Sequence, residues 1–159
     1  MASSKEMNNA LEVYNTLIET LDNRRWVYDR EDDKLIISLN VNGEDLLMKF
    51  VFSCDIERQL LRVLSFLPFD MKEENRVLGA VATAMINYNL AEGSFDYSIE
   101  SGKLYYVINT SFRGSIISTN LIDHLIDICC FTVDKYNDLL AGLNDGKMDL
   151  DEFFAAINE

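Results

Sequence analysis

A run of acidic residues near the C-terminus has the spacing of the second half of a calcium-binding EF-hand loop. Gly146 falls at the position of the sharp turn, Asp149 at the ninth position and Glu152 at the twelfth, where a bidentate glutamate binds the ion. The same register puts Ala141 first and Leu143 third, where oxygen ligands are required. Asp149 and Glu152 also have the spacing of a capping box, so a helix start explains the same residues. We therefore expect a capped helix here and no metal site.

The only histidine, His124, and the three cysteines are the remaining candidates for nucleophilic or metal chemistry. Cys129 and Cys130 follow His124 by five and six residues on one expected helix, so their side chains point away from it. Cys54 could reach His124 only through tertiary packing, and no spacing of these residues builds a tetrahedral zinc set. Carboxylate pairs are too common to single out an acid–base pair, and no phosphate-binding motif is present. The sequence predicts no catalytic residue, no cofactor and no enzyme activity.

Aromatic and apolar residues in the expected strands are a better lead. Phe95 and Tyr97 share one face of a strand, and Tyr105 has the opposite parity to the apolar residues beside it. In the third expected strand both parities are apolar, with Leu61 and Val63 among them. If helices cover only one face of the sheet, some of these side chains lie on the other face, where an apolar patch marks a partner site or a dimer interface. The candidate interaction surface is therefore Phe95, Tyr97, Tyr105, Leu61 and Val63, with an ordinary core as the alternative.

Composition limits the partners and the compartment. The 159-residue chain carries 27 acidic and 14 basic residues, a net charge of −13. Binding to nucleic acid or to an anionic membrane needs clustered Lys and Arg, so neither is an expected partner, whereas the acidity could steer a basic protein. No apolar run approaches the ~18 residues that a spanning helix needs. Three cysteines in apolar segments form no disulfide framework, and the N-terminus lacks a signal-peptide pattern, so we expect a cytoplasmic protein.

Hydrophobic periodicity divides the chain into helices and strands joined by short turns. We expect helices over residues 4–23, 71–91, 119–142 and 149–158, and strands over residues 34–41, 45–53, 59–67, 95–99 and 103–110. A short strand over residues 26–28 is a further option, followed by a charged turn over residues 29–33. Asn42 and Gly43 predict a tight hairpin, because both residues tolerate positive φ. The last long helix has an apolar stripe of Leu125, Cys129, Val133, Tyr136 and Leu140.

The expected helix over residues 71–91 lies at the centre of this arrangement. Asp70 and Glu73 have capping-box spacing at its start, and Gly93 suits a left-handed stop at its end. The elements before and after this helix and its hairpin are expected to cover them. Apolar residues recur at helical spacing and predict one stripe, formed by Val77, Val81, Ala84, Met85 and Tyr88.

The order of the elements predicts the fold class. Strands grouped by short turns indicate an antiparallel sheet, because a parallel sheet needs a crossover between its strands. We therefore expect an α+β fold, with an antiparallel sheet of about five strands and helices packed on one face. The length suits a single domain over residues 1–159, with a core over residues 5–143 and a C-terminal helix over residues 149–158.

The segment order and three stretches of sequence resemble the YbjN family, small bacterial proteins often labelled as candidate sensory transduction regulators. The stretches are the opening helix that ends at Leu21 and leads to Trp26, the passage from Leu64 through Pro68 to Asn89, and the hairpin from Gly93 to Tyr106. The resemblance covers about residues 5–140, with the final helix outside it, and implies a fold like that of the type III secretion chaperones. It also implies a protein that binds other proteins, commonly as a homodimer, and it carries over no catalytic residue.

Three hypotheses for the function follow. The leading one is a non-enzymatic protein-interaction module, regulatory or chaperone-like, which predicts a large apolar patch on the folded monomer or a buried dimer interface. The alternative is a small-ligand sensor, which predicts an apolar pocket between the sheet and the helices. An enzyme with carboxylate chemistry ranks last, because it needs clustered Asp or Glu residues with raised pKa values in a cleft.

Overall fold

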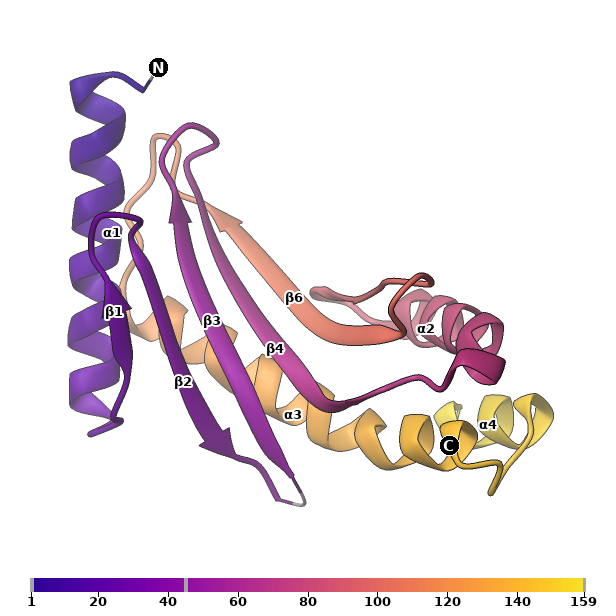
Figure 1. Cartoon of the computed structure of the whole chain (residues 1–159). Coiled ribbons are helices and arrows are strands. Elements are labelled where there is room, and N and C mark those ends of the chain that lie inside the picture. The colour runs from indigo at the N-terminus through magenta and orange to yellow at the C-terminus, as the bar shows by residue number, and fades with distance from the viewer. Residues whose placement is uncertain (1, 45, 159) are drawn as a thin grey trace.

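The computed structural model describes residues 2–44 and 46–158. Its centre is one antiparallel sheet with the strand order β1-β2-β3-β4-β6-β5 (Figure 1). The strands are β1 (Asp29–Glu31), β2 (Ile36–Asn42), β3 (Leu47–Asp55), β4 (Leu60–Asp70), β5 (Ser94–Tyr97) and β6 (Lys103–Ser111). The sheet therefore has six strands where about five were expected. The additional strand is β1, which replaces the expected charged turn and has no buried residue that could have revealed it as alternation.

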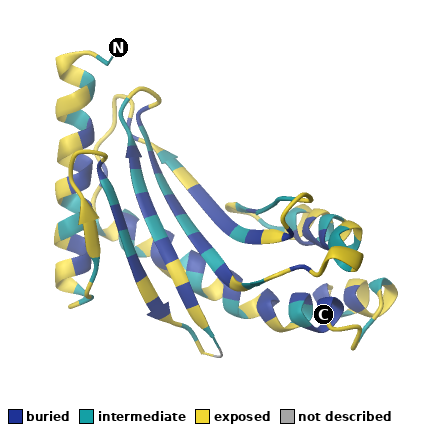
Figure 2. Ribbon diagram, in the orientation of Figure 1, coloured by how far each residue is buried: buried dark blue, intermediate teal, exposed yellow. Residues whose placement is uncertain are grey.

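The described residues also form four helices, α1 (Ser4–Asn23), α2 (Arg76–Asn89), α3 (Thr119–Asn144) and α4 (Leu150–Ile157). In Figure 1, α3 runs behind strands β2 to β4, and α1 stands along the edge formed by β1 and β2. Side chains alternate between buried and more exposed positions along the long strands (Figure 2). The core therefore lies between one face of the sheet and the helices, in a cluster that includes Leu17, Leu21, Ile37, Phe50, Phe52, Leu61, Val63, Tyr106, Cys129 and Val133.

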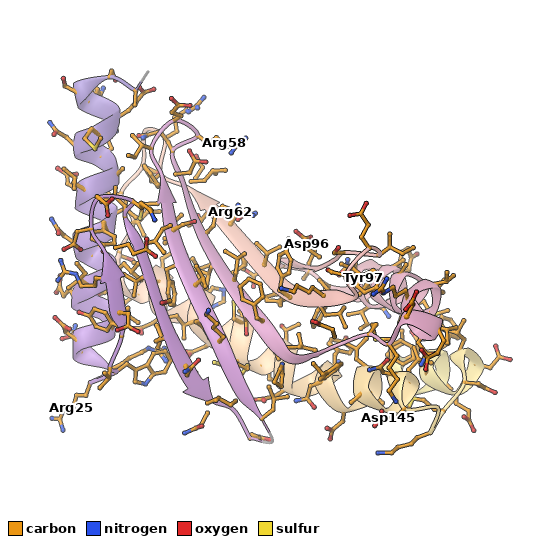
Figure 3. All side chains as sticks on the ribbon, in the orientation of Figure 1. Arg25, Arg58, Arg62, Asp96, Tyr97 and Asp145 are labelled. Carbon is orange, nitrogen blue, oxygen red and sulfur yellow. The ribbon has the colours of Figure 1, made fainter. Side chains whose placement is uncertain are left out.

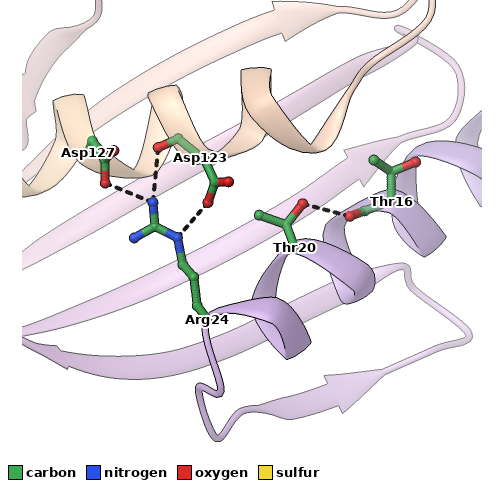
Figure 4. A network of polar contacts seen from close by, with 5 residues as sticks. All are labelled: Thr16, Thr20, Arg24, Asp123 and Asp127. Atoms are coloured by element: carbon green, nitrogen blue, oxygen red, sulfur yellow. Dashed lines mark hydrogen bonds and ion pairs between the residues drawn. The ribbon is translucent and has the colours of Figure 1, made fainter.

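A network of ion pairs joins the end of α1 to α3 (Figure 4). Arg24 Nε donates to Asp123 Oδ1 at 2.6 Å, and the Nη2 atom of Arg24 donates to Asp127 Oδ1 at 2.8 Å. The same guanidinium lies 5.0 Å from the ring centroid of Trp26, within the range of a cation–π contact. These contacts hold the end of α1 beside the first turns of α3.

The expected hairpin at Asn42 and Gly43 is confirmed. Strands β2 and β3 pair antiparallel as far as Asn42 and Leu47, and the Gly43 N–H donates to the Leu46 carbonyl at 2.8 Å. The expected strand over residues 45–53 begins at Asp45, which lies outside the described residues. The hairpin places β3 beside β2 with the apolar side chains of both strands on the helix side of the sheet.

The start of α2 differs from the prediction, because the capping box between Asp70 and Glu73 does not form. Strand β4 continues through Asp70, and Glu73–Asn75 form a single 3₁₀ turn before α2 begins without a side-chain cap. The side chain of Asn144, at the end of α3, accepts from the Lys72 N–H at 2.8 Å and donates to the Asp70 carbonyl at 3.1 Å. The backbone groups of Asp70 and Lys72 are therefore bonded to a residue far away in the sequence, and no local helix cap forms.

The buried face of α2 also differs from the prediction. Val77, Val81, Ala84 and Tyr88 face solvent, and Val77 and Tyr88 are 67% and 91% exposed. The physical reason is that α2 is apolar on both sides and Arg76 is its only charged residue, so periodicity finds a stripe without deciding which side is covered. The side chains that α2 buries are those of Ala82, Thr83 and Ile86, and Gly79 is buried with them.

Candidate interaction surface

The EF-hand-like turn is held by a helix cap and by an ion pair to Lys72. Asp149 and Glu152 make both bonds of the expected capping box at the start of α4. Asp145 accepts a hydrogen bond from Lys72 Nζ at 2.9 Å, which lowers the pKa of the Asp145 carboxyl. Across residues 2–44 and 46–158, no group of three or more His, Cys, Asp or Glu side chains is placed to hold a metal ion. The acidic run is therefore a helix start and a surface ion pair.

His124 and the cysteines lie in different environments. His124 Nε2 is 3.2 Å from each carboxylate oxygen of Glu92 at the surface. Cys54 and Cys129 are buried, and burial raises the pKa of the Cys54 thiol to about 12. Burial also raises the pKa of half-buried Cys130 to about 11. Because the thiolate is the nucleophilic form, these protonated thiols are poor candidates for covalent chemistry.

The five predicted surface residues fall on different sides of the sheet. Leu61, Val63 and Phe95 are 0%, 0% and 2% exposed and belong to the core. The expectation that these three residues lie on the surface is therefore wrong. Side chains alternate between the two faces of a strand, and these three lie on the face that packs against the helices. Tyr97 is half-buried, and its hydroxyl donates to a backbone carbonyl at the start of α2 at 2.8 Å. Tyr105 is half-buried on the opposite face of the sheet, which faces away from α1 and α3.

The face of the sheet away from α1 and α3 carries an apolar patch. In the described chain no helix covers β3 and β4 on this side (Figure 1). The registers place Val51 opposite Leu64, Leu64 opposite Val107, and Phe66 opposite Tyr105. The rings of Phe66 and Tyr105 have centroids 5.1 Å apart, and burial raises the pKa of Tyr105. We call this set the open patch: the half-buried Val51, Leu64, Phe66 and Tyr105, together with Val107, which is buried among its neighbours.

Two surface grooves adjoin the open patch. One, of about 510 Å³, lies beside β3, β4 and the start of β6 and has Phe66 in its lining. The other, of about 470 Å³, lies between α2 and the β5–β6 hairpin and has Tyr105 in its lining. The Phe66 and Tyr105 rings pack against each other at an interplanar angle of 37°, and they lie between the two grooves. The further lining residues include Lys49, Pro68, Phe69 and Lys103 in the first groove, and Ala80, Ala84, Asn87 and Asp96 in the second.

The ligand-sensor alternative expected a pocket between the sheet and the helices. Cys129, Val133 and Leu140 of α3 are fully buried there, in the same cluster as the inward side chains of the strands. The first groove lies on the outer side of the sheet, and the second is a surface groove between α2 and the β5–β6 hairpin. Their position suits contact with a macromolecule better than enclosure of a small ligand.

The outer edge of β5 is closed by one side chain. Asn87 Oδ1 accepts from the Phe95 N–H at 2.7 Å, and Asn87 Nδ2 donates to the Phe95 carbonyl at 2.9 Å. These are the main-chain groups that an added strand would use. A partner at this end of the sheet therefore meets its face rather than its edge.

Sequence reasoning missed most of the open patch, although one signal was present. Strand β4 has apolar side chains on both of its faces. Its paired segment has one charged residue, Arg62, which lies on the same face as Leu64 and Phe66. Figure 3 shows Arg62 on β4 and Asp96 on β5, at two borders of the patch. Since an unpaired charge is rarely buried, Arg62 marks the parity that faces solvent.

Comparisons with known proteins show likeness at the level of structure. No protein-family model matches the chain, and no curated protein matches its sequence. The HopA1–SchA chaperone–effector complex matches with a TM-score of 0.53 at 14% identity, covering 87% of this chain and 97% of that chain. The ExsC–ExsE complex matches with a TM-score of 0.58 at 12% identity, covering 82% and 95%. YbjN from E. coli, described as a candidate transcription regulator, matches with a TM-score of 0.57 at 10% identity, covering 79% and 91%.

The chain has the fold of the type III secretion chaperones. This confirms the expected α+β class with an antiparallel sheet. The resemblance to YbjN seen in the sequence is matched by the structure at the level of the fold. No helix in the described ranges combines the length and the apolar character needed to cross a membrane.

Proposed function

We propose that this chain is a non-enzymatic protein-interaction module, regulatory or chaperone-like, that acts in the cytoplasm as a homodimer of the YbjN type. The observation that carries the proposal is the open patch, an apolar sheet face with no helix over it in the described chain. Covering apolar surface contributes roughly 25 cal/mol per Å² removed from water, so a partner segment on this face gains affinity from it. Contiguous apolar patches of this kind are typical of interaction sites.

The similar structures support this proposal at the level of the fold. One of them is a chaperone–effector complex and another is a complex of two proteins, so the fold is one that holds a second protein in those cases. The side chains that could have served in catalysis or metal binding also support a non-enzymatic role. Asp145, Asp149 and Glu152 are used in an ion pair and a helix cap, and burial raises the pKa of the Cys54 and Cys130 thiols, which disfavours nucleophilic chemistry.

The homodimer is proposed to form through the exposed stripe of α2, which is Val77, Val81, Ala84 and Tyr88. Two copies of a chain with a net charge of −13 repel one another least where the surface carries few charges. Helix α2 has one charged residue, whereas 26% of the whole chain is charged. A two-fold interface brings the same stripe together from both copies, so an uncharged apolar stripe is complementary to itself.

Capture of partners from the native cell lysate tests the proposal. The immobilised native chain is compared with Tyr105→Glu, which places a charge in the open patch, and with Phe131→Glu as the matched control. Phe131 is 68% exposed on α3, away from the patch. We expect a specific protein to be retained by the native chain and by Phe131→Glu, and lost from Tyr105→Glu. Retention by all three proteins, or by none of them, would contradict a protein-binding role for this face.

A further inference from the structure

The open patch is bordered by basic residues in a chain that is strongly acidic overall. Lys49 on β3 lies opposite Phe66, Arg62 lies on the same face of β4, and Lys103 begins β6 beside the first groove. Within residues 2–44 and 46–158, none of these three basic side chains makes an ion pair. Arg62 Nε donates to the neutral Asn109 side chain at 3.3 Å. The three positive charges therefore remain available to a partner.

Acidic residues also lie near this face. Asp55 is paired with Arg58 at 3.1 Å (Figure 3 labels Arg58 at the β3–β4 turn). Asp70 and Asp96 lie at the rims of the two grooves. Asp29 of β1 is on the same face, in the row of Ser38 and Val51, and lines a groove together with Lys49. In the described chain the face thus has three cations and three carboxylates without an ion pair. The local balance is neutral, whereas the whole chain carries 13 more acidic than basic residues.

The spacing of the cations matches that of an extended peptide. Arg62 is four residues from Phe66 along β4, which is about 13 Å at 3.3 Å per residue, and Lys49 sits beside Phe66 in the next strand. In an extended segment, residues two apart share a side, and residues four apart are also separated by about 13 Å. Two carboxylates at that spacing would reach Arg62 at one end and Lys49 at the other. A large apolar side chain midway between them would lie over Leu64.

We propose that the open patch binds an extended segment of another protein in which two acidic residues, four positions apart, flank a large apolar residue. This inference rests on the proposed function and names its partner class. The attraction acts at short range, because the Debye length at physiological ionic strength is about 8 Å. Lys49 and Arg62 contact such a segment directly, while the acidic surfaces beyond the sheet are screened from it. Charge complementarity of this kind sets specificity more than raw affinity.

The test uses the full chain and three fluorescent nine-residue peptides. Each peptide has Phe at its fifth position and Ser elsewhere, with Asp, Asn or Lys at both the third and the seventh positions. We expect the Asp peptide to bind at least about tenfold more tightly than the Asn peptide in anisotropy titrations, with an affinity that falls as NaCl is raised. In the double variant Lys49→Glu/Arg62→Glu the order is expected to reverse, so that the Lys peptide binds most tightly.

Control variants and the other outcomes separate this inference from the proposed function. The variant Lys49→Gln/Arg62→Gln removes the charges without reversing them and is expected to bind the Asp and Asn peptides equally. Equal binding of these two peptides to the native chain would overturn the charge pattern and leave the apolar protein-binding face standing. Failure of all three peptides to bind would overturn the inference, while lysate capture still tests the proposed function. A loss of dimer mass in Lys49→Glu/Arg62→Glu would show that a second copy covers this face, which also overturns the inference.

Discussion

At the scale of single residues, Asn87 pairs with both outward main-chain groups of Phe95. In Asn87→Ala these two groups lose their protein partners, and leaving such groups unpaired in a partly buried site costs about 1–3 kcal/mol. We expect faster amide hydrogen exchange at Phe95, measured by NMR, and a lower urea midpoint. Asn89→Ala is the matched control, because it removes an exposed amide from the same helix whose hydrogen bond, at 3.3 Å, is to the exposed Asn158 side chain and not to β5. A native exchange rate at Phe95 in Asn87→Ala would contradict the role of Asn87 at this edge.

Residue-level features that depend on short sequence distances could be predicted. The capping box of Ser3 and Glu6 is present at the start of α1. Gly93 has a left-handed φ of 64°, but α2 already ends at Asn89 with an extended Leu90, so Gly93 turns the chain into β5 and is not the expected helix stop. The faces of Phe95 and Tyr105 depend instead on which side of the sheet the helices cover. That choice is made by packing between residues far apart in the chain, so alternation alone could not separate these two side chains.

At the scale of elements, α2 combines a buried side with an exposed apolar stripe, and the proposed dimer uses that stripe. Val81→Glu places a charge in the middle of the stripe, and Glu has a higher helix propensity than Val, so the helix itself should persist. We expect the native chain to have the mass of a dimer by light scattering and Val81→Glu to have the mass of a monomer. Phe131→Glu should leave the dimer intact. A monomeric native chain, or an intact dimer in Val81→Glu, would contradict the proposed interface.

The contrast between α3 and α2 shows what periodicity can decide. The predicted stripe of α3 is confirmed, since all five of its residues are buried: Leu125, Cys129, Val133, Tyr136 and Leu140. Helix α3 carries acidic residues on its outer side, including Asp127 and Asp138, and these fix which face is covered. Helix α2 has no such markers, and its start is set by Asn144 from another element. Both failures in α2 therefore come from interactions that are not local in sequence.

At the scale of the whole molecule, the fold class could be predicted because short turns between strands require antiparallel pairing. The number of strands could not, because β1 consists of three exposed residues that lack any apolar alternation. The candidate site was harder still. The open patch draws Val51, Leu64 and Val107 together from β3, β4 and β6, so it exists only once the strand order is known. Sequence reasoning reached Tyr105 of this patch and missed its neighbours.

Carboxyl groups with lowered pKa values make the stability of the whole molecule depend on pH in the acidic range. The Ser3 backbone N–H donates to Glu6 and lowers the pKa of its carboxyl, and Lys72 does the same for Asp145 through a side-chain hydrogen bond. A carboxyl whose folded pKa lies below its unfolded value stabilises the fold above that unfolded value, here 4.5 for Glu and 3.8 for Asp. Its contribution is lost as the pH falls through the folded pKa.

We therefore expect the urea midpoint to fall steeply below about pH 4, whereas the contribution of these two carboxyls stays constant between about pH 7 and pH 5. The double variant Glu6→Gln/Asp145→Asn removes both ionisations, so it should start from a lower midpoint at neutral pH and lose less on acidification. Asp151→Asn, which changes an exposed carboxyl on α4, is the control for the change in net charge alone. If the native chain and the double variant lost stability in parallel below about pH 4, the prediction would be wrong, and the loss of stability in acid would come from the other carboxylates of this acidic chain.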